Sequence, residues 1–162
     1  MENKTQKHYK VGIVIGRFQP FHNGHQYLLK EALKIADKII IGIGSSNVKN
    51  ADNPWTSAQR KEVIEKIIAE EDISENVVKI VEIPDHPDDE EWYKITMERA
   101  GVIDVSIGNN DWVNGILKRH KVAVVEVPFF KRYLNEGVKI RKLMKEGKNW
   151  QNRVPPYIIP IL

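Results

Sequence analysis

Five short apolar runs, rich in β-branched residues, recur along the chain and are separated by segments with helical periodicity. The runs occupy residues 11–15, 38–43, 77–83, 102–107 and 122–127. Unbroken apolar runs are typical of strands buried on both faces, and strands that alternate with helices form parallel sheets. The pattern therefore predicts an α/β fold, with a Rossmann-like, doubly wound parallel sheet of about five strands in a single domain.

The segments between the runs carry helix signals. Helices are expected behind His25, after the capping-box pair Thr56 and Gln59, and over residues 90–100 and 111–120. In open sheets of this kind, ligands bind beyond the carboxyl ends of the strands. The residues that fall there are Gly16, Gly44, Asp85, Gly108 and Pro128.

The length of the chain bounds its organisation. A chain of 162 residues is long enough for one domain with a real core and too short for two ordinary ones. We assign residues 10–162 to that domain and residues 1–9 to a polar tail that is expected to be mobile. The tail lacks the apolar region of a secretion signal, and no apolar stretch reaches membrane-spanning length. We therefore expect a cytoplasmic protein with no membrane contact.

The net charge and the absence of cysteine limit the classes of ligand and of chemistry that the chain can support. A net charge of +3 and a pI near 9.0 favour acidic small molecules or nucleic acid. The lysines are scattered and no basic strand is rich in aromatic residues, so we expect no nucleic-acid partner. The absence of cysteine excludes a disulfide framework, a zinc cluster built on thiolates and a thiol nucleophile.

The most specific local signal is the segment GRFQPFHNGH, residues 16–25, directly after the first apolar run. Pro20 bars a helix through residue 19, and Gly24 allows close approach of the backbone to a ligand. His22 and His25 lie at i and i+3, so both would project from the first helical turn into one space. A helix start also offers free N–H groups to an anion, which makes a phosphate the expected ligand.

A metal site is the competing interpretation of the two histidines. It would want a third strong ligand nearby, and no cysteine exists to supply one. We therefore expect no metal held by protein side chains.

The ten-residue segment resembles the HxGH signature of the nucleotidyltransferase superfamily. Its long form resembles that of the archaeal type of nicotinamide mononucleotide (NMN) adenylyltransferase. Aminoacyl-tRNA synthetases with a related motif carry a Lys-Met-Ser-Lys-Ser loop, which is missing here. The segment Gly42-Ile43-Gly44-Ser45-Ser46-Asn47 is not a dinucleotide fingerprint, because Asn47 replaces the third glycine, and a Walker A lysine motif is absent too.

Further segments match the family in part. Residues 53–60 (NPWTSAQR) resemble its Asn-Pro-Phe-Thr-Ala-Gly-Glu-Arg segment, which implies that Arg60 grips phosphate. Asp85 and Trp92 look like the nicotinamide-side elements, with the indole stacked on the pyridinium ring. Gly108 and Asn109 resemble a Gly-Asn element placed against the nucleotide.

A second phosphate motif is expected at residues 135–144, where a helix would begin with Arg141 one turn in. Gly137, Arg141 and Met144 fit the family's Ser-Gly-Thr-x-Val-Arg-Arg-Arg-Met pattern. Glu136 and Val138 replace its serine and threonine, which puts the strength of ATP binding or the rate in question.

The resemblance implies an enzyme that joins ATP and NMN to give NAD and pyrophosphate. Mg²⁺ would be held mainly through the ATP phosphates. The protein would be a homo-oligomer, with a hexamer as one implied form. The implied catalytic residues are His22, His25, Arg17, Arg60 and Arg141. The implied ATP and phosphate contacts are Gly16, Arg17, Phe18, His22, Gly24, His25, Gly108, Asn109, Gly137 and Arg141, and the implied NMN contacts are Asp85, Trp92, Arg60 and Gly44.

Two alternatives stay open from the sequence. Another HxGH adenylyl- or cytidylyltransferase, acting on pantetheine phosphate or FMN, would share the histidine motif. The substitutions at Glu136 and Val138 also allow a nucleotide-binding protein with weakened catalysis.

Overall fold

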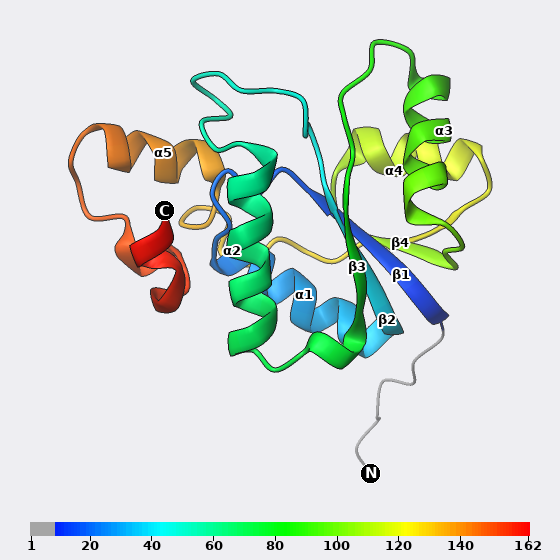
Figure 1. Cartoon of the computed structure of the whole chain (residues 1–162), viewed down its shortest axis with the longest axis horizontal. Helices are drawn as coiled ribbons and strands as arrows, with labels where there is room; N and C mark the ends of the chain where they lie inside the picture. The colour runs from blue at the N-terminus through cyan, green and yellow to red at the C-terminus, as the bar shows by residue number, and fades with distance from the viewer. Residues whose placement is uncertain (1–8) are drawn as a thin grey trace.

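The computed structural model describes residues 9–162 and contains a five-stranded parallel sheet between two layers of helices (Figure 1). The strands are β1 (Tyr9–Gly16), β2 (Ala36–Ile43), β3 (Val77–Glu82), β4 (Val105–Ile107) and β5 (Ala123–Val125). The α-helices are α1 (Asn23–Ile35), α2 (Ser57–Glu70), α3 (Asp89–Ala100), α4 (Asp111–Arg119) and α5 (Gly137–Lys145), and three 3₁₀ turns occupy Ser74–Asn76, Gln151–Arg153 and Pro156–Ile161. The predicted Rossmann-like α/β class is confirmed.

The strand order is β3-β2-β1-β4-β5, with every pair parallel. The chain builds outward from β1 to β3 and then returns to the other side of β1 for β4. Open sheets bind ligands where the order reverses in this way. The candidate site is therefore expected beyond the carboxyl ends of β1 and β4.

The two faces of the sheet have separate cores. Alternate residues of β1 point to opposite faces, so Val14 packs with α1 and α2 while Ile13 packs with α3 and α4. Both side chains are fully buried. The strands are shorter at the β4 and β5 edge than the apolar runs predict, because β4 begins only at Val105 and β5 ends at Val125.

The predicted polar tail falls mostly outside the described residues. Tyr9, which we had assigned to it, is instead the first residue of β1 and pairs with Ala36. None of the helices in residues 9–162 is long and apolar enough to cross a bilayer.

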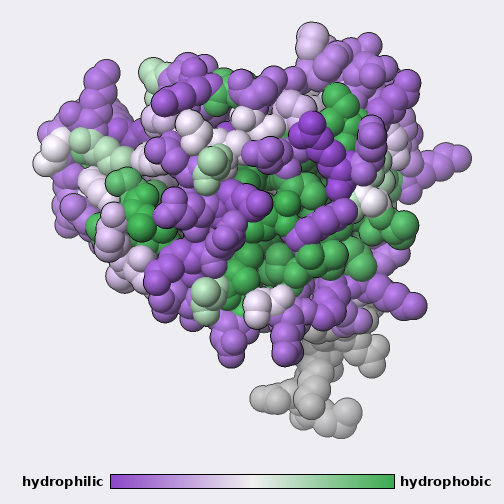
Figure 2. Space-filling view, viewed as in Figure 1, coloured by the Kyte–Doolittle hydropathy of each residue, from purple (hydrophilic) through white to green (hydrophobic). Residues whose placement is uncertain are grey.

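Helix starts are where the sequence predicted them. Thr56 and Gln59 form the predicted capping box of α2, and Asp88 caps α3 by accepting from the backbone N–H groups of Glu90 and Glu91. On the face shown in Figure 2 the surface is mostly hydrophilic, with an apolar area over the edge strand β3, where Val78 is exposed.

The C-terminal 3₁₀ turn packs on the α1 and α2 side of the sheet through Ile158 and its apolar neighbours, and it makes a polar contact with Glu71, the C-cap residue of α2. The Tyr157 hydroxyl donates to Glu71 Oε1 over 2.7 Å, and Gln26 Nε2 of α1 donates to the same oxygen. The hydrogen bond from Tyr157 is the largest cause that holds the pKa of Glu71 below its ordinary value.

We expect Tyr157→Phe to lower the free energy of unfolding by about 1–2 kcal/mol at neutral pH, because a hydrogen bond to a charged acceptor is lost. The depressed pKa of Glu71 means that this contribution is present at neutral pH and is lost as acid protonates the carboxylate. Urea titrations at pH 7 and below pH 4 measure both effects. Tyr133→Phe, at a tyrosine that is 68% exposed, is the matched control and should change nothing.

Candidate active site

Two recesses open at the carboxyl edge of the sheet. The larger is a cleft of about 510 Å³, bounded by the end of β1, the loop after β3 and the starts of α3 and α4. The smaller, about 130 Å³, lies between the start of α1 and the segment before α5. A narrow third recess shares Ile15 and Asn110 with the first and Asn109 with the second, so the two adjoin at the ends of β1 and β4.

The two histidines of the motif cap α1 reciprocally. His22 is the N-cap residue, and its Nδ1 accepts from the backbone N–H groups of Gly24 and His25 at 3.1 and 3.4 Å. His25 Nδ1 accepts from the backbone N–H of His22 at 3.1 Å. Since both Nδ1 atoms are acceptors, the ring protons sit on Nε2. Both side chains line the smaller recess.

Burial keeps both imidazoles neutral. It lowers the pKa of His22 to about 4, and burial together with the adjacent His22 lowers the pKa of His25 well below its ordinary value. The rings stack with centroids 3.7 Å apart, and Phe18 packs edge-on against His25 at 4.7 Å. The site therefore presents two uncharged Nε2–H donors.

This geometry corrects two expectations about the helix start. The N–H groups of Gly24 and His25 are not free for an anion, because the His22 ring occupies them. Gly24 is needed for a different reason than expected: a Cβ there would lie 2.9 Å from His22 Cε1. Phe18, which we expected to contact phosphate, is 3% exposed and supports His25 from the core.

Arg60 also differs from its expected role. It is 1% exposed, and Nη1 donates to the carbonyls of Arg17 and Gly44 while Nη2 donates to that of Ser45. Its guanidinium thus joins the loops after β1 and β2 rather than facing either recess. A direct grip on phosphate does not fit this arrangement, so Arg60 is a positioning residue.

Gln19 performs a similar task, and the sequence analysis missed it. Its side-chain amide makes two hydrogen bonds with the backbone of Trp55, and its carbonyl accepts from Arg141 Nη1 at 2.7 Å. Gln19 therefore holds the predicted Asn-Pro-Trp-Thr segment and α5 against the histidine loop. The sole available signal was its place inside the ten-residue motif.

Arginine side chains border both recesses. Arg17 is exposed and lines the larger cleft, and Arg132 lines the smaller one. Arg141 donates to the Gln19 carbonyl and lies beside Gly137, which borders the smaller recess. Burial, followed by repulsion from Arg17, lowers the pKa of Arg141.

No side chain caps the backbone N–H groups at the start of α5, and a phosphate site requires such free donors. Its N-cap residue, Glu136, makes no side-chain hydrogen bond to the helix and pairs instead with Arg132 and Lys139. Gly137 borders the smaller recess, and a Cβ there would lie 2.9 Å from Arg141 Nη1. The side chain of Val138 is 53% exposed and supplies no donor.

The nicotinamide-side residues lie around the larger cleft. Asp85 accepts from the Ser45 hydroxyl at 2.8 Å, and Gly44 lines the cleft beside it. Trp92 reaches the cleft but is 2% exposed and packs in the core with α4. The expected stacking of Trp92 on a ligand ring stays a prediction.

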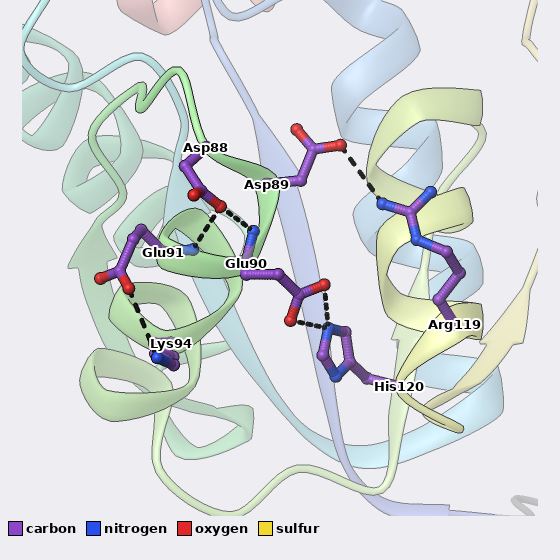
Figure 3. A network of polar contacts seen from close by, with 7 residues as sticks. All are labelled: Asp88, Asp89, Glu90, Glu91, Lys94, Arg119 and His120. Carbon is purple, nitrogen blue, oxygen red and sulfur yellow. Dashed lines mark hydrogen bonds and ion pairs between the residues drawn. The ribbon is translucent and has the colours of Figure 1, made fainter.

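The first turn of α3 touches both ends of α4. Asp89 pairs with Arg119 and Glu90 with His120, a cluster that we call the α3–α4 bridge (Figure 3). At the other end of α4, Trp92 meets Trp112 edge to face at 5.0 Å. The acidic cluster at the start of α3 thus caps and docks the helix, and no group of three His, Asp or Glu side chains in residues 9–162 is arranged as metal ligands.

Gly16, Gly108 and Asn109 lie at the strand ends, as predicted. Gly16 lines the larger cleft, and Gly108 borders the narrow recess. Asn109 donates to the Val127 carbonyl at 2.9 Å and lines both the narrow recess and the smaller one.

Comparison with known proteins agrees with the family that the ten-residue motif resembles. A family model described as cytidylyltransferase-like matches residues 13–150. A nicotinamide-nucleotide adenylyltransferase from Methanosphaerula palustris is 32% identical over 149 residues, which cover 91% of this chain and 87% of the relative. The chain belongs to this family of nucleotidyltransferases.

Solved structures agree with the family. A bifunctional NMN adenylyltransferase/ADP-ribose pyrophosphatase from Francisella tularensis superposes with a TM-score of 0.79 at 25% identity. The match covers 90% of this chain and 45% of that one, so the chain spans less than half of the bifunctional protein. A second structure of that bifunctional enzyme, with a TM-score of 0.71, 25% identity and 90% and 44% of the two chains covered, is complexed with AMP and a manganese ion. The family resemblance stated from the motif is confirmed.

Arg60→Lys should lower the free energy of unfolding by about 2–3 kcal/mol, because the guanidinium donates from three nitrogens to four carbonyls and a single ammonium nitrogen cannot reach them all. Chemical denaturation measures this loss. Arg99→Lys is the matched control, since Arg99 also donates to a carbonyl but is exposed. A variant that stays fully stable and loses only turnover would show that Arg60 contacts the phosphates after all.

The depressed pKa of His22 predicts an acid-sensitive fold. Between pH 6.5 and about 4 the unfolded chain binds a proton that the folded His22 excludes, so stability is full above pH 6.5 and falls as the pH drops through this window. We expect His22→Asn, which keeps an N-cap acceptor, to remove about 2–3 kcal/mol of this dependence. Urea titrations at pH 7.5 and 4.5 compare the two proteins; equal pH dependence would contradict the assigned neutral state.

Proposed function

We propose that this chain transfers the adenylyl group of ATP to NMN, giving NAD and pyrophosphate. The observation that carries the proposal is the pair of stacked neutral imidazoles with Nδ1 committed to the helix backbone, beside two adjoining recesses. The smaller recess, with the open start of α5, suits the phosphates of ATP. The larger cleft suits the mononucleotide.

The reaction needs alignment and charge stabilisation rather than a protein nucleophile. An oxygen of the NMN 5′-phosphate forms a bond to the α-phosphorus of ATP, and the bond from that phosphorus to the bridging oxygen breaks. The electron pair leaves with pyrophosphate. The attacking phosphate is already anionic, so no side chain has to remove a proton. The chain's contribution is to hold the reactants in line and to stabilise the developing charge.

Each facing group has a distinct task in this scheme. The Nε2–H groups of His22 and His25 donate to α- and β-phosphate oxygens. Arg141 and the N–H groups at the start of α5 hold the β- and γ-phosphates, with Gly137 leaving room for the guanidinium. Arg17 lies at the edge of the larger cleft, where it serves the phosphate of NMN. Gly16, Gly108 and Asn109 contribute backbone and amide contacts at the strand ends.

Mg²⁺ fits this site as a partner of ATP rather than of the protein. The one carboxylate that lines the smaller recess within residues 9–162, that of Glu136, already pairs with Arg132 and Lys139, whereas Mg²⁺ needs oxygen ligands. Its ligands would come from the phosphates and water, and its chemistry would be neutralisation of phosphate charge. The chain's own residues perform the positioning described above.

Three expectations stay predictions. They are the cytoplasmic location, the absence of nucleic-acid and membrane partners, and assembly into a homo-oligomer such as a hexamer.

A coupled assay of NAD formation from ATP and NMN tests the function, with pantetheine phosphate and FMN offered as competing acceptors. We expect His25→Ala and His22→Asn each to cut kcat by about 10²-fold or more, the scale of losing a preorganised donor. His22→Asn keeps an acceptor at the helix cap but removes both the Nε2–H and the ring that stacks on His25. Lys66→Ala, at a surface ion pair of α2, is the control. Wild-type turnover in both histidine variants would refute the mechanism.

A further inference from the structure

The 3₁₀ turn Gln151–Arg153, which we call the 151–153 turn, is tied to both walls of the smaller recess. One wall is the start of α1, and the other is the segment that leads into α5. The Asn23 side chain of α1 donates to the Asn152 carbonyl at 3.1 Å. On the other wall, Arg153 Nη1 donates to the Leu134 carbonyl at 2.8 Å. Two hydrogen bonds thus join both walls to one three-residue turn.

The 151–153 turn is itself anchored in the core. Trp150, just before it, packs against the core on the α1 and α2 side of the sheet, and Val154, just after it, is buried in the same core. The backbone N–H of Arg153 donates to the Trp150 carbonyl at 2.9 Å. Because packed side chains flank the turn, it is a fixed point for the two walls. The turn follows residues 13–150, which the family model matches, so the family motifs did not draw attention to it.

The wall that Arg153 holds moves as a unit. Asn135, next to Leu134, is 6% exposed and lines the recess directly before α5. Its Nδ2 donates to the Phe130 carbonyl at 3.1 Å, and the backbone N–H groups of Leu134 and Asn135 both donate to the Lys131 carbonyl at 2.9 Å. Residues 130–135 therefore form a closed loop, and a displacement of the Leu134 carbonyl displaces the recess wall and the start of α5.

The stability of the fold does not account for Arg153. Its Nη1 makes one hydrogen bond, but its Nε is buried and has no hydrogen-bond partner in the part of the chain that the structure describes. A buried donor without a partner costs about as much free energy as one neutral acceptor's hydrogen bond contributes. The two effects offset each other, so the position of the recess wall is the better explanation for this arginine.

We propose that the 151–153 turn sets the width of the smaller recess, and that Arg153 is a positioning residue for the triphosphate of ATP. The inference rests on the proposed function, which assigns the ATP phosphates to this recess. Arg153 lines neither recess, so it acts through Leu134 and Asn135. Asn23 acts in the same way on the opposite wall, next to His22. Loosening either tie lets the imidazole donors and the start of α5 separate, and one phosphate chain then no longer reaches both at hydrogen-bond distance.

Calorimetry on the full chain tests the inference, with ATP and NMN titrated separately. Arg153→Met keeps a long side chain but removes the donor, and we expect it to weaken ATP binding about threefold to tenfold, the scale of one hydrogen bond. NMN binding should stay within about twofold. Asn23→Ala, on the opposite wall, should have the same selective effect. Arg153→Lys, which keeps a donor for the Leu134 carbonyl, should bind ATP within about twofold of wild type.

Two further measurements separate positioning from a general loss of structure. The urea midpoint of Arg153→Met should equal that of wild type, because the lost hydrogen bond and the removed unpaired donor offset each other. Hydrogen exchange of the ligand-free protein should become faster over residues 130–140 in the same variant. Arg99→Met is the matched control and should change none of these values, since Arg99 Nη1 also donates to a carbonyl, that of Glu82 at 2.7 Å, and lines neither recess.

Unchanged ATP affinity in both Arg153→Met and Asn23→Ala would overturn the inference. An equal fall in ATP and NMN affinity, a fall in the urea midpoint that accompanies the loss of ATP binding, or unchanged exchange over residues 130–140 would also overturn it. Failure of the proposed function gives a different result. If wild type binds ATP as described but forms no NAD, the function falls and the inference stands. If wild type does not bind ATP at all, both fall.

Discussion

The reciprocal cap formed by His22 and His25 is the interaction on which the rest of the site depends. A helix start leaves backbone N–H groups without partners, and this chain satisfies three of them with two imidazole Nδ1 atoms. The same bonds fix the tautomer and the direction of both rings. Burial then keeps them neutral, so their Nε2–H groups act as dipolar donors. Helix stability and the proposed phosphate contacts thus come from opposite nitrogens of the same two rings.

Around this cap, long polar side chains are used to position loops. Arg60 joins the loops after β1 and β2, and Gln19 joins the histidine loop to residue 55 and to α5. The carbonyls of Arg17, Gly44 and Ser45, which accept from Arg60, lie beyond the ends of β1 and β2. A buried guanidinium can satisfy several such carbonyls at once, which explains why a cation is retained where only backbone surrounds it. Arg17 is left lining the larger cleft, and Arg141 lies beside Gly137 at the edge of the smaller recess.

The sequence predicted the fold well because strands and helices are marked by local, periodic patterns of residues. The buried strands and the capping box at Thr56 each depend on residues a few positions apart. The site was harder, since its details depend on contacts between distant segments. Arg60 looks like any helix arginine until the carbonyls of Arg17 and Gly44 are placed beside it, and the burial of Trp92 follows from the packing of α3 on α4. Trp112 lies outside the recognised motifs, and only the folded cleft brings it next to Asp85.

The α3–α4 bridge has a consequence for how this cleft can diversify. Arg119 and His120 sit on the outside of the molecule, a helix length away from Trp112, yet they fix the helix that carries it. Neither residue lines a recess, so exchanging them changes no side chain that borders the ligand space. Surface charges of this kind cost little stability when changed. The histidine cap has no such freedom, because the rings that stabilise the start of α1 also line the smaller recess.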